Sequence, residues 1–265
     1  MLSKWFGSRR MDGGSREGRN KNARPALEGL ESRLLLYSTL GANWTYGSRI
    51  TYSFVPDGTN IGGLSSNLYS TLNSKFSTAT WQDQFKKAAA MWQSYANINL
   101  VNVSDNGTRL AGGDYQQGDP NMGDIRISMV SLPSNQLAFT FLPPPLNGGS
   151  DSGDIVFNSN VSWQINSNYD LLTVALHEFG HALGLDHSSY STADMYATYT
   201  GLKQAPTSDD IAGIQSIYGA VQNDAFDSGG TNNNTYTTAT NINSYLNADA
   251  QIALSGLNIS STSDS

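Results

Sequence analysis

All three histidines of the chain lie in one short stretch, residues 177–187. His177 and His181 are four residues apart, so on a helix their side chains lie one turn above the other on the same face. Two imidazole nitrogens on that face can bind one metal ion at about 2.0 to 2.1 Å. Because the chain has no cysteine, any metal must be bound by histidine or carboxylate.

The residues before and after the histidines predict a helix that bears His177 and His181 and a turn that brings His187 near them. Asp170 is a good N-cap, and an apolar stripe follows it at helical spacing: Leu171, Leu172, Ala175, Leu176, Phe179 and Leu183. Gly184 should end this helix, because glycine adopts a positive φ at little cost and lets the chain fold back. His187 can then approach the same ion from another direction, which leaves one position open. Glu178 is placed as a general base beside that position.

The whole string from His177 to His187 reads H-E-x-x-H-x-x-G-x-x-H, the long zinc-binding pattern. With Met195 eight residues beyond the last histidine, the chain resembles the metzincin clan of zinc endopeptidases, and more narrowly a matrixin catalytic domain from about residue 47 to 219. The resemblance implies an α+β metzincin fold with a twisted, mixed five-stranded sheet and about three helices. It also implies an active-site helix at a cleft between a larger N-terminal and a smaller C-terminal subdomain.

The resemblance gives roles to residues outside the zinc-binding string. Met195 would be the methionine of the turn that forms a floor beneath the metal, and Tyr199 would lie in the wall of the primary specificity pocket. Leu137, Ala138 and Phe139 match the edge strand against which an extended substrate pairs by main-chain hydrogen bonds. An ordinary edge strand without that role is an alternative that the sequence leaves open.

The resemblance implies one catalytic zinc ion, bound by the three histidines. It also matches Asp124 and Asp154 to positions that help to bind calcium in the family. Strand-end or turn-forming roles are the alternative for both aspartates. Phe139 and Val156 stand where animal matrixins have histidines for a second, structural zinc ion, so this second zinc is not expected.

The rest of the central region mixes strands with a helix. Residues 49–55 alternate apolar and polar side chains, which predicts a half-buried strand. Thr80 and Asp83 form a capping-box-like pair that predicts the start of a helix running to about Ala96. Further strands are expected at residues 98–103, 124–129, 137–142 and 153–157.

Composition divides the chain into three segments. Residues 1–40 contain eight basic and four acidic side chains and predict a basic leader without stable structure. Within it, residues 24–36 resemble the LEPR-XLL segment found near the start of some large bacterial surface and exported proteins. Residues 41–220 should form the catalytic domain. Residues 221–265 are rich in Asn, Ser, Thr and Gly and predict a linker and the start of a truncated β module.

These features favour one function and leave two alternatives. A net charge of −7 provides no broad positive surface for nucleic acid, and no apolar run reaches the roughly 18 to 20 residues of a membrane span. We therefore expect a secreted, extracellular or cell-surface zinc metalloendopeptidase that acts on protein or peptide substrates, with no prediction of its oligomeric state. The alternatives are a catalytically silent, metal-binding surface or adhesion protein and a zinc hydrolase acting on a non-peptide amide or ester.

Overall fold

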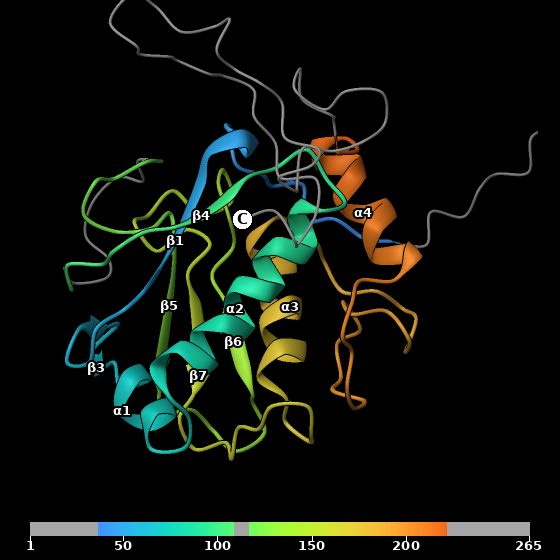
Figure 1. Cartoon of the computed structure of the whole chain (residues 1–265). Helices are drawn as coiled ribbons and strands as arrows, with labels where there is room; N and C mark the ends of the chain where they lie inside the picture. Colours follow the sequence, from blue (N-terminus) through green and yellow to red (C-terminus); the bar gives the residue numbers. More distant parts are fainter. Residues whose placement is uncertain (1–36, 109–116, 222–265) are drawn as a thin grey trace, which may run out of the picture. The chain divides into compact units, whose positions relative to one another are not determined.

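A computed structural model describes residues 37–108 and 117–221, in which a mixed sheet packs against helices (Figure 1). The five strands lie in the order β4-β1-β5-β7-β6, and only the pairing of β6 with β7 is antiparallel. The strand bounds are β1 Ile50–Phe54, β4 Leu100–Asn102, β5 Ile125–Val130, β6 Ala138–Thr140 and β7 Ile155–Asn158. This arrangement confirms the expected α+β fold with its five-stranded mixed sheet.

The remaining elements lie around this sheet. A small hairpin is formed by β2 Asn60–Ile61 and β3 Leu64–Ser65. The helices are η1 Gly47–Arg49, α1 Leu68–Asn73, α2 Thr78–Gln93, α3 Leu171–Ala182 and α4 Ser208–Tyr218. The predicted strands over 98–103 and 137–142 are each shorter than expected, and the predicted helix and strands otherwise appear in the predicted order.

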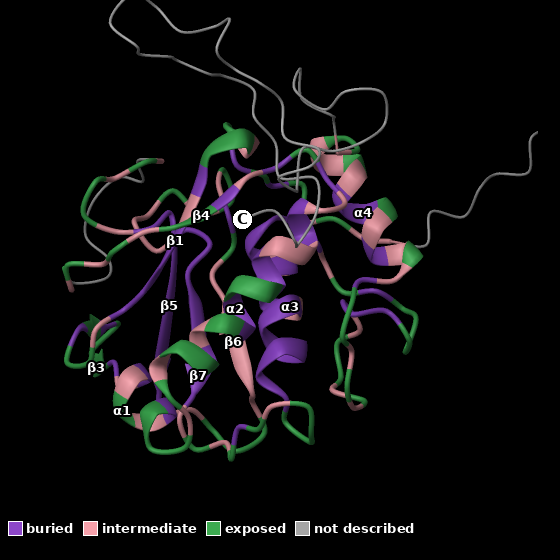
Figure 2. Ribbon diagram, in the orientation of Figure 1, coloured by how far each residue is buried: buried purple, intermediate pink, exposed green. Residues whose placement is uncertain are grey.

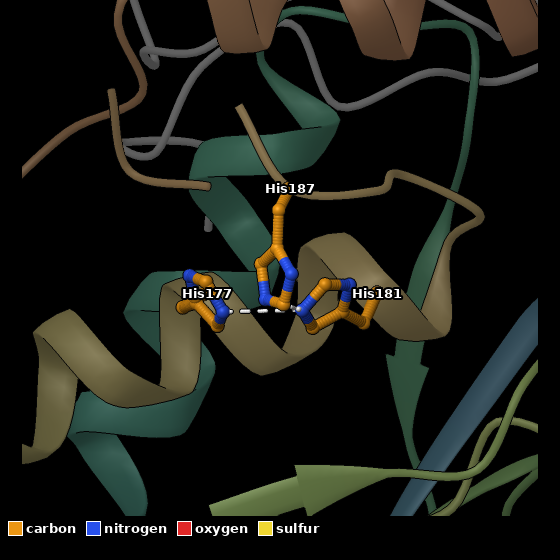
Figure 3. Close-up of side chains that lie close together, drawn as sticks. All are labelled: His177, His181 and His187. Carbon is orange, nitrogen blue, oxygen red and sulfur yellow. Dashed lines mark hydrogen bonds between the residues drawn. The ribbon is translucent and has the colours of Figure 1, made fainter. Parts of the chain in front are cut away.

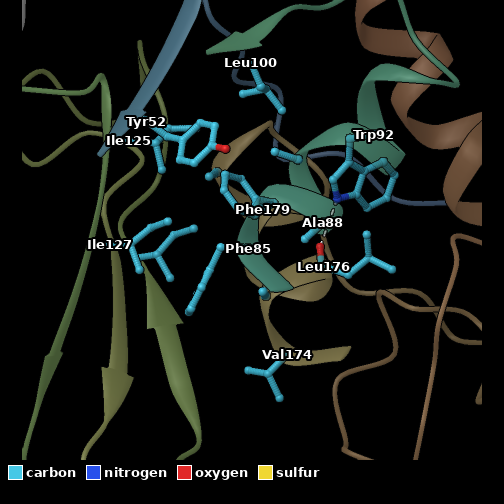
Figure 4. Close-up of a cluster of buried hydrophobic side chains, with 14 of the residues drawn as sticks. Tyr52, Phe85, Ala88, Trp92, Leu100, Ile125, Ile127, Val174, Leu176 and Phe179 are labelled. Atoms are coloured by element: carbon cyan, nitrogen blue, oxygen red, sulfur yellow. Dashed lines mark hydrogen bonds between the residues drawn. The ribbon is translucent and has the colours of Figure 1, made fainter. Parts of the chain in front are cut away.

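Apolar side chains from the sheet, α2 and α3 form the main core (Figure 4). The rings of Phe85 on α2 and Phe157 on β7 lie 5.1 Å apart between their centroids. The Trp92 indole donates a hydrogen bond of 3.0 Å to the carbonyl of Leu176, which joins α2 directly to α3. Helix α3 is buried along most of its length, so its surroundings fix its position (Figure 2).

The predicted start of α2 was wrong by three residues. The helix begins at Thr78, and its N-cap is Ser77, whose hydroxyl accepts a hydrogen bond from the Thr80 amide at 3.2 Å. Ser77, rather than Thr80, is therefore the residue that caps this helix. Asp83 instead forms an exposed ion pair with Lys87, four residues further along the helix.

The strand predicted to be half-buried at residues 49–55 appears as β1, in which every residue but Thr51 is buried, and its neighbour β5 is buried on both faces. Ile125 and Ile127 face the main core, whereas Arg126 faces the opposite side and is only 1% exposed. The Arg126 guanidinium donates from Nε and Nη2 to the two carboxylate oxygens of Asp105, at 2.8 and 2.7 Å. Ser53 on β1 donates to the same carboxylate. The loop after β4 therefore covers this face of β5.

The predicted division into leader, catalytic domain and C-terminal segment stays a prediction. Residues 1–36 and 222–265, which contain the LEPR-XLL-like segment and the expected linker, lie outside the described residues. Residues 38–40 contact the zinc-binding string, because the Leu40 amide donates to the Gly184 carbonyl and the Asp186 amide donates to the Ser38 carbonyl. None of the helices in the described part of the chain has the length and apolar character needed to cross a membrane.

Candidate metal centre and cleft

Helix α3 carries two of the three histidines, and both of its ends are as predicted. The Asp170 carboxylate accepts hydrogen bonds from the Thr173 amide and hydroxyl, each at 2.9 Å, and so caps the helix. The helix ends at Ala182, and Gly184 adopts a φ of +102° that turns the chain back. This turn brings His187 alongside the helix.

The three imidazole rings point toward one common centre (Figure 3). The Nε2 atom of His181 lies 3.1 Å from the Nε2 atoms of both His177 and His187. A tetrahedral ion bound at about 2.0 to 2.1 Å places its ligand nitrogens about 3.3 to 3.4 Å apart, which is close to these separations. In the described residues, this is the only group of three or more potential metal ligands whose donor atoms all lie within 4.8 Å of one another.

Backbone carbonyls outside the helix set the orientation of the two helical histidines. The Nδ1 atom of His177 lies 2.8 Å from the carbonyl oxygen of Asp194, and the Nδ1 atom of His181 lies 2.8 Å from that of Leu185. Because a carbonyl only accepts, each Nδ1 carries the hydrogen and each Nε2 presents a lone pair. The short contact between the two Nε2 atoms therefore joins two acceptors, an arrangement that a metal cation satisfies.

Burial keeps both of these rings neutral. Desolvation lowers the pKa of His177 to about 3 and the pKa of His181 to about 4. Neutral imidazole is the form that binds a metal ion, so no proton has to be displaced from these rings near neutral pH. The donor set, its neutrality and its spacing all fit a zinc ion.

Met195 lies against α3, and its role as a floor beneath the metal stays a prediction. It is 2% exposed, and a β-carbon added at Gly180 would come within 2.3 Å of its sulfur. The Asp210 carboxylate holds this turn by accepting hydrogen bonds from the amides of Asp194 and Met195, at 2.8 and 3.0 Å. The same bonds hold the Asp194 carbonyl that orients His177.

Asp210 was missed by the sequence analysis, although a signal was present. Thr207 and Asp210 form a capping box at the start of α4, with the Thr207 amide donating to the Asp210 carboxylate at 2.8 Å. The pattern of Thr followed three residues later by an acid predicts such a helix start. The sequence gives no sign, however, that the acid also binds the turn around Met195.

An open cleft of about 920 Å³ runs past the histidines. Leu137, Ala138, Phe139 and Tyr199 all contribute to its lining. The Tyr199 hydroxyl accepts a hydrogen bond of 3.2 Å from the Asp170 amide, which fixes that side chain near the start of α3. The structure thus brings these four sequence-predicted substrate residues to one cleft with the histidines.

Glu178 also lines this cleft, although its side chain is only 5% exposed. Burial raises its pKa to about 7, and a hydrogen bond from Thr140 opposes this effect. The Thr140 hydroxyl lies 2.6 Å from Glu178 Oε2. Thr140 is the second residue that the sequence analysis missed, and its only signal was its place in the predicted edge strand.

The family comparison agrees with this geometry. A family model described as Matrixin matches residues 67–219, which is more than half of the chain. The chain belongs to the matrixin family. Matrixins are zinc metalloendopeptidases, and the histidine triad of this matrixin domain fits a zinc site.

Individual relatives are similar over the same part of the chain. Karilysin of Tannerella forsythia is 33% identical over 153 residues, covering 56% of this chain and 30% of karilysin. Interstitial collagenase of Equus caballus is 37% identical over 145 residues, covering 52% of this chain and 28% of the collagenase. Matrilysin of Rattus norvegicus is 37% identical over 143 residues, covering 51% of this chain and 49% of matrilysin. The chain therefore aligns with less than half of the length of each of these relatives.

In this matrixin, Phe139 and Val156 are direct cross-strand partners on β6 and β7. Both belong to a small apolar cluster on the face of the sheet opposite the main core. The ring of Phe139 packs edge to face with Phe141, with 5.3 Å between the centroids. Both side chains thus take part in apolar packing, and the expectation that no second zinc binds at these positions stays a prediction.

Asp124 and Asp154 have different environments. The Asp124 carboxylate accepts hydrogen bonds from the Thr51 amide, the Thr51 hydroxyl and the Gly118 amide, at 2.8, 2.9 and 2.6 Å. Asp154 accepts one bond from the Arg126 amide on Oδ1, while Oδ2 is buried without a hydrogen-bond partner among the described residues. Asp124 thus fits the turn-forming alternative, whereas Asp154 has a free ligand atom.

Proposed function

We propose that this chain is a zinc-dependent endopeptidase that hydrolyses peptide bonds of extended polypeptides in the cleft beside β6. The observation that carries the proposal is the convergence of the three histidine Nε2 atoms in a cleft that the buried Glu178 also lines. A surface protein that only bound zinc would not need a buried carboxylate in the same cleft. The proposal also includes a secreted or extracellular location, as expected from the family and the composition.

The chemistry follows from the groups that line the cleft. A zinc ion bound by the histidines would supply a Lewis acid that polarises the scissile carbonyl and acidifies water. Glu178 accepts the proton of the attacking water and passes it to the nitrogen of the leaving amine. In the metal-free chain, burial raises the pKa of Glu178 above its ordinary value, which makes its carboxylate a stronger proton acceptor.

Substrate binding follows from the position of β6 at the edge of the sheet. Among residues 37–108 and 117–221, this strand pairs only with β7, so its other side can take main-chain hydrogen bonds from an extended peptide. Leu137, Ala138 and Phe139 would provide this edge, and Tyr199 would border the pocket for one substrate side chain. In such a complex, alternate side chains of the peptide point to opposite sides, which gives selectivity.

Calcium binding is a separate part of the proposal, and it centres on Asp154. Its Oδ2 atom is buried and has no hydrogen-bond partner among the described residues, which is costly unless a cation or proton satisfies it. Oxygen ligands of this kind suit calcium. Asp124 is the weaker ligand of the two, because its oxygens already accept three hydrogen bonds.

The test is cleavage of an unfolded protein by the purified chain, with chelator added and zinc then restored. We expect cleavage to stop with the chelator and to return with zinc. Glu178→Gln preserves size and shape, so it should bind zinc with unchanged stoichiometry and lose at least about 100-fold in turnover. Zinc binding without any cleavage by the wild type would favour the silent binding protein. Hydrolysis of small esters without peptide cleavage would favour the non-peptide hydrolase.

A further inference from the structure

Thr140 is the last residue of β6 and lies beside the proposed general base. Its hydroxyl oxygen is 2.6 Å from Glu178 Oε2 and 3.2 Å from the carbonyl oxygen of Glu178. A carboxylate only accepts hydrogen bonds, so the hydroxyl donates its single hydrogen, and the shorter contact identifies the carboxylate as its main acceptor. We propose that Thr140 is a positioning residue that fixes the Glu178 carboxylate for proton transfer.

The sheet holds this hydroxyl in place. Thr140 pairs with Ile155 on β7, and the amide of the next residue, Phe141, donates to the Asp154 carbonyl at 2.9 Å. Successive side chains of a strand point to opposite faces. Because Phe139 and Phe141 pack on the face away from the main core, Thr140 faces α3. The donor therefore stands on a rigid element that is separate from the helix that carries the base.

Glu178 depends on this contact for its orientation. A glutamate side chain has three rotatable bonds, and burial alone does not select one position for its carboxylate. Among the described residues, the Thr140 hydroxyl is the one hydrogen-bond donor to this carboxylate. Anchoring Oε2 leaves Oε1 free to accept the proton of water. The strand proposed to bind the substrate thus also carries the group that orients the base.

The inference rests on the proposed peptidase function, and Thr140→Val tests it because valine keeps the shape and removes the hydroxyl. The zinc-loaded full chain is assayed with a quenched fluorescent peptide. We expect kcat to fall about tenfold, with KM within about twofold of wild type and zinc content unchanged. Thr140→Ser keeps the hydroxyl and should restore kcat to within about threefold. Thr71→Val, in α1 and outside the cleft, is the matched control and should leave kcat unchanged.

A second comparison asks whether the effect acts through Glu178. In a Glu178→Asp background, the shorter side chain withdraws the carboxylate from the hydroxyl, so adding Thr140→Val should reduce the residual kcat by less than about twofold. An additive tenfold loss would overturn the proposal. If Thr140→Val does not fold by circular dichroism, Thr140→Ala replaces it in both comparisons.

The remaining outcomes separate this inference from the proposed function. Full activity of Thr140→Val would overturn the positioning role, because the hydroxyl would then be dispensable. Equal losses of activity in Thr140→Val and Thr140→Ser would also overturn it, because the loss would then come from packing. A raised KM with unchanged kcat would also overturn it, because the hydroxyl would then act on substrate binding. A zinc-loaded wild type without peptidase activity would instead refute the proposed function itself.

Discussion

Gly184→Ala should damage both the stability and the metal site of this domain. Gly184 has a φ of +102°, and a β-carbon at this position would lie 2.1 Å from the carbonyl oxygen of Ala42. The Gly184 carbonyl also accepts a hydrogen bond of 2.9 Å from the Leu40 amide. The substitution therefore strains the backbone and forces apart two segments that are distant in the sequence.

The magnitude has two parts. A side chain in the left-handed region costs about 1 to 2 kcal/mol. The distance from the added β-carbon to the Ala42 carbonyl oxygen is shorter than real β-carbon contacts, and a backbone oxygen cannot rotate away as a side chain can. The backbone must therefore shift, which costs about 1 to 3 kcal/mol. The sum of about 2 to 5 kcal/mol is a large part of the roughly 5 to 15 kcal/mol that stabilises a typical domain.

Urea denaturation of the zinc-free chain measures this loss, and Gly58→Ala is the matched control. Gly58 also has a positive φ, +88°, but a β-carbon added there would meet no atom within 4 Å, so this variant should lose only the conformational part. Zinc affinity should fall in Gly184→Ala, because His187 is three residues further on, and stay unchanged in Gly58→Ala. Equal losses of stability in the two variants would refute the argument from the Ala42 contact.

Two further predictions concern buried charge. Asp105→Ala leaves the Arg126 guanidinium buried without its partner, so the free energy of unfolding should fall by about 3 to 5 kcal/mol. Asp83→Ala breaks only the exposed pair with Lys87 and should lower it by less than about 1 kcal/mol. Similar losses for the two variants in urea denaturation would contradict this ranking. Burial raises the pKa of Asp154 well above 3.8, so the folded state retains a proton that the unfolded chain releases, and stability in calcium-free buffer should fall as the pH rises above about 4. Asp154→Asn should flatten this decline in stability and abolish any stabilisation by added calcium. If the variant's denaturation curves keep the wild-type dependence on pH and calcium, Asp154 neither causes the decline nor binds calcium.

The sequence predicts α3 and the convergence of the three histidines correctly because both depend on local rules. The spacing of His177 and His181, the cap at Asp170 and the turn at Gly184 each act within one or two helical turns. The start of α2 shows the limit of such rules. Ser77 and Thr80 are both good caps, and the sequence alone does not decide which hydroxyl accepts a hydrogen bond from a free amide of the first turn.

Contacts between distant segments were not predictable in the same way. The bond from Thr140 to Glu178 joins residues 38 apart, and the pair of Arg126 with Asp105 joins residues 21 apart. Both depend on how β6 and the loop after β4 pack against the rest of the domain. An alternating pattern indicates which side chains share a face of a strand, but it does not indicate what covers that face.

The metal centre is shaped more by the segment after α3 than by α3 itself. The helix sets the spacing of His177 and His181, but the carbonyls of Asp194 and Leu185 select the nitrogen that each ring presents. The Asp194 carbonyl is itself held in place because the amides of Asp194 and Met195 donate hydrogen bonds to the Asp210 carboxylate on α4. A change in either support should rotate a ring without altering any ligand. Loss of zinc affinity is therefore expected from substitutions at non-ligand positions such as Gly184, where the turn is built.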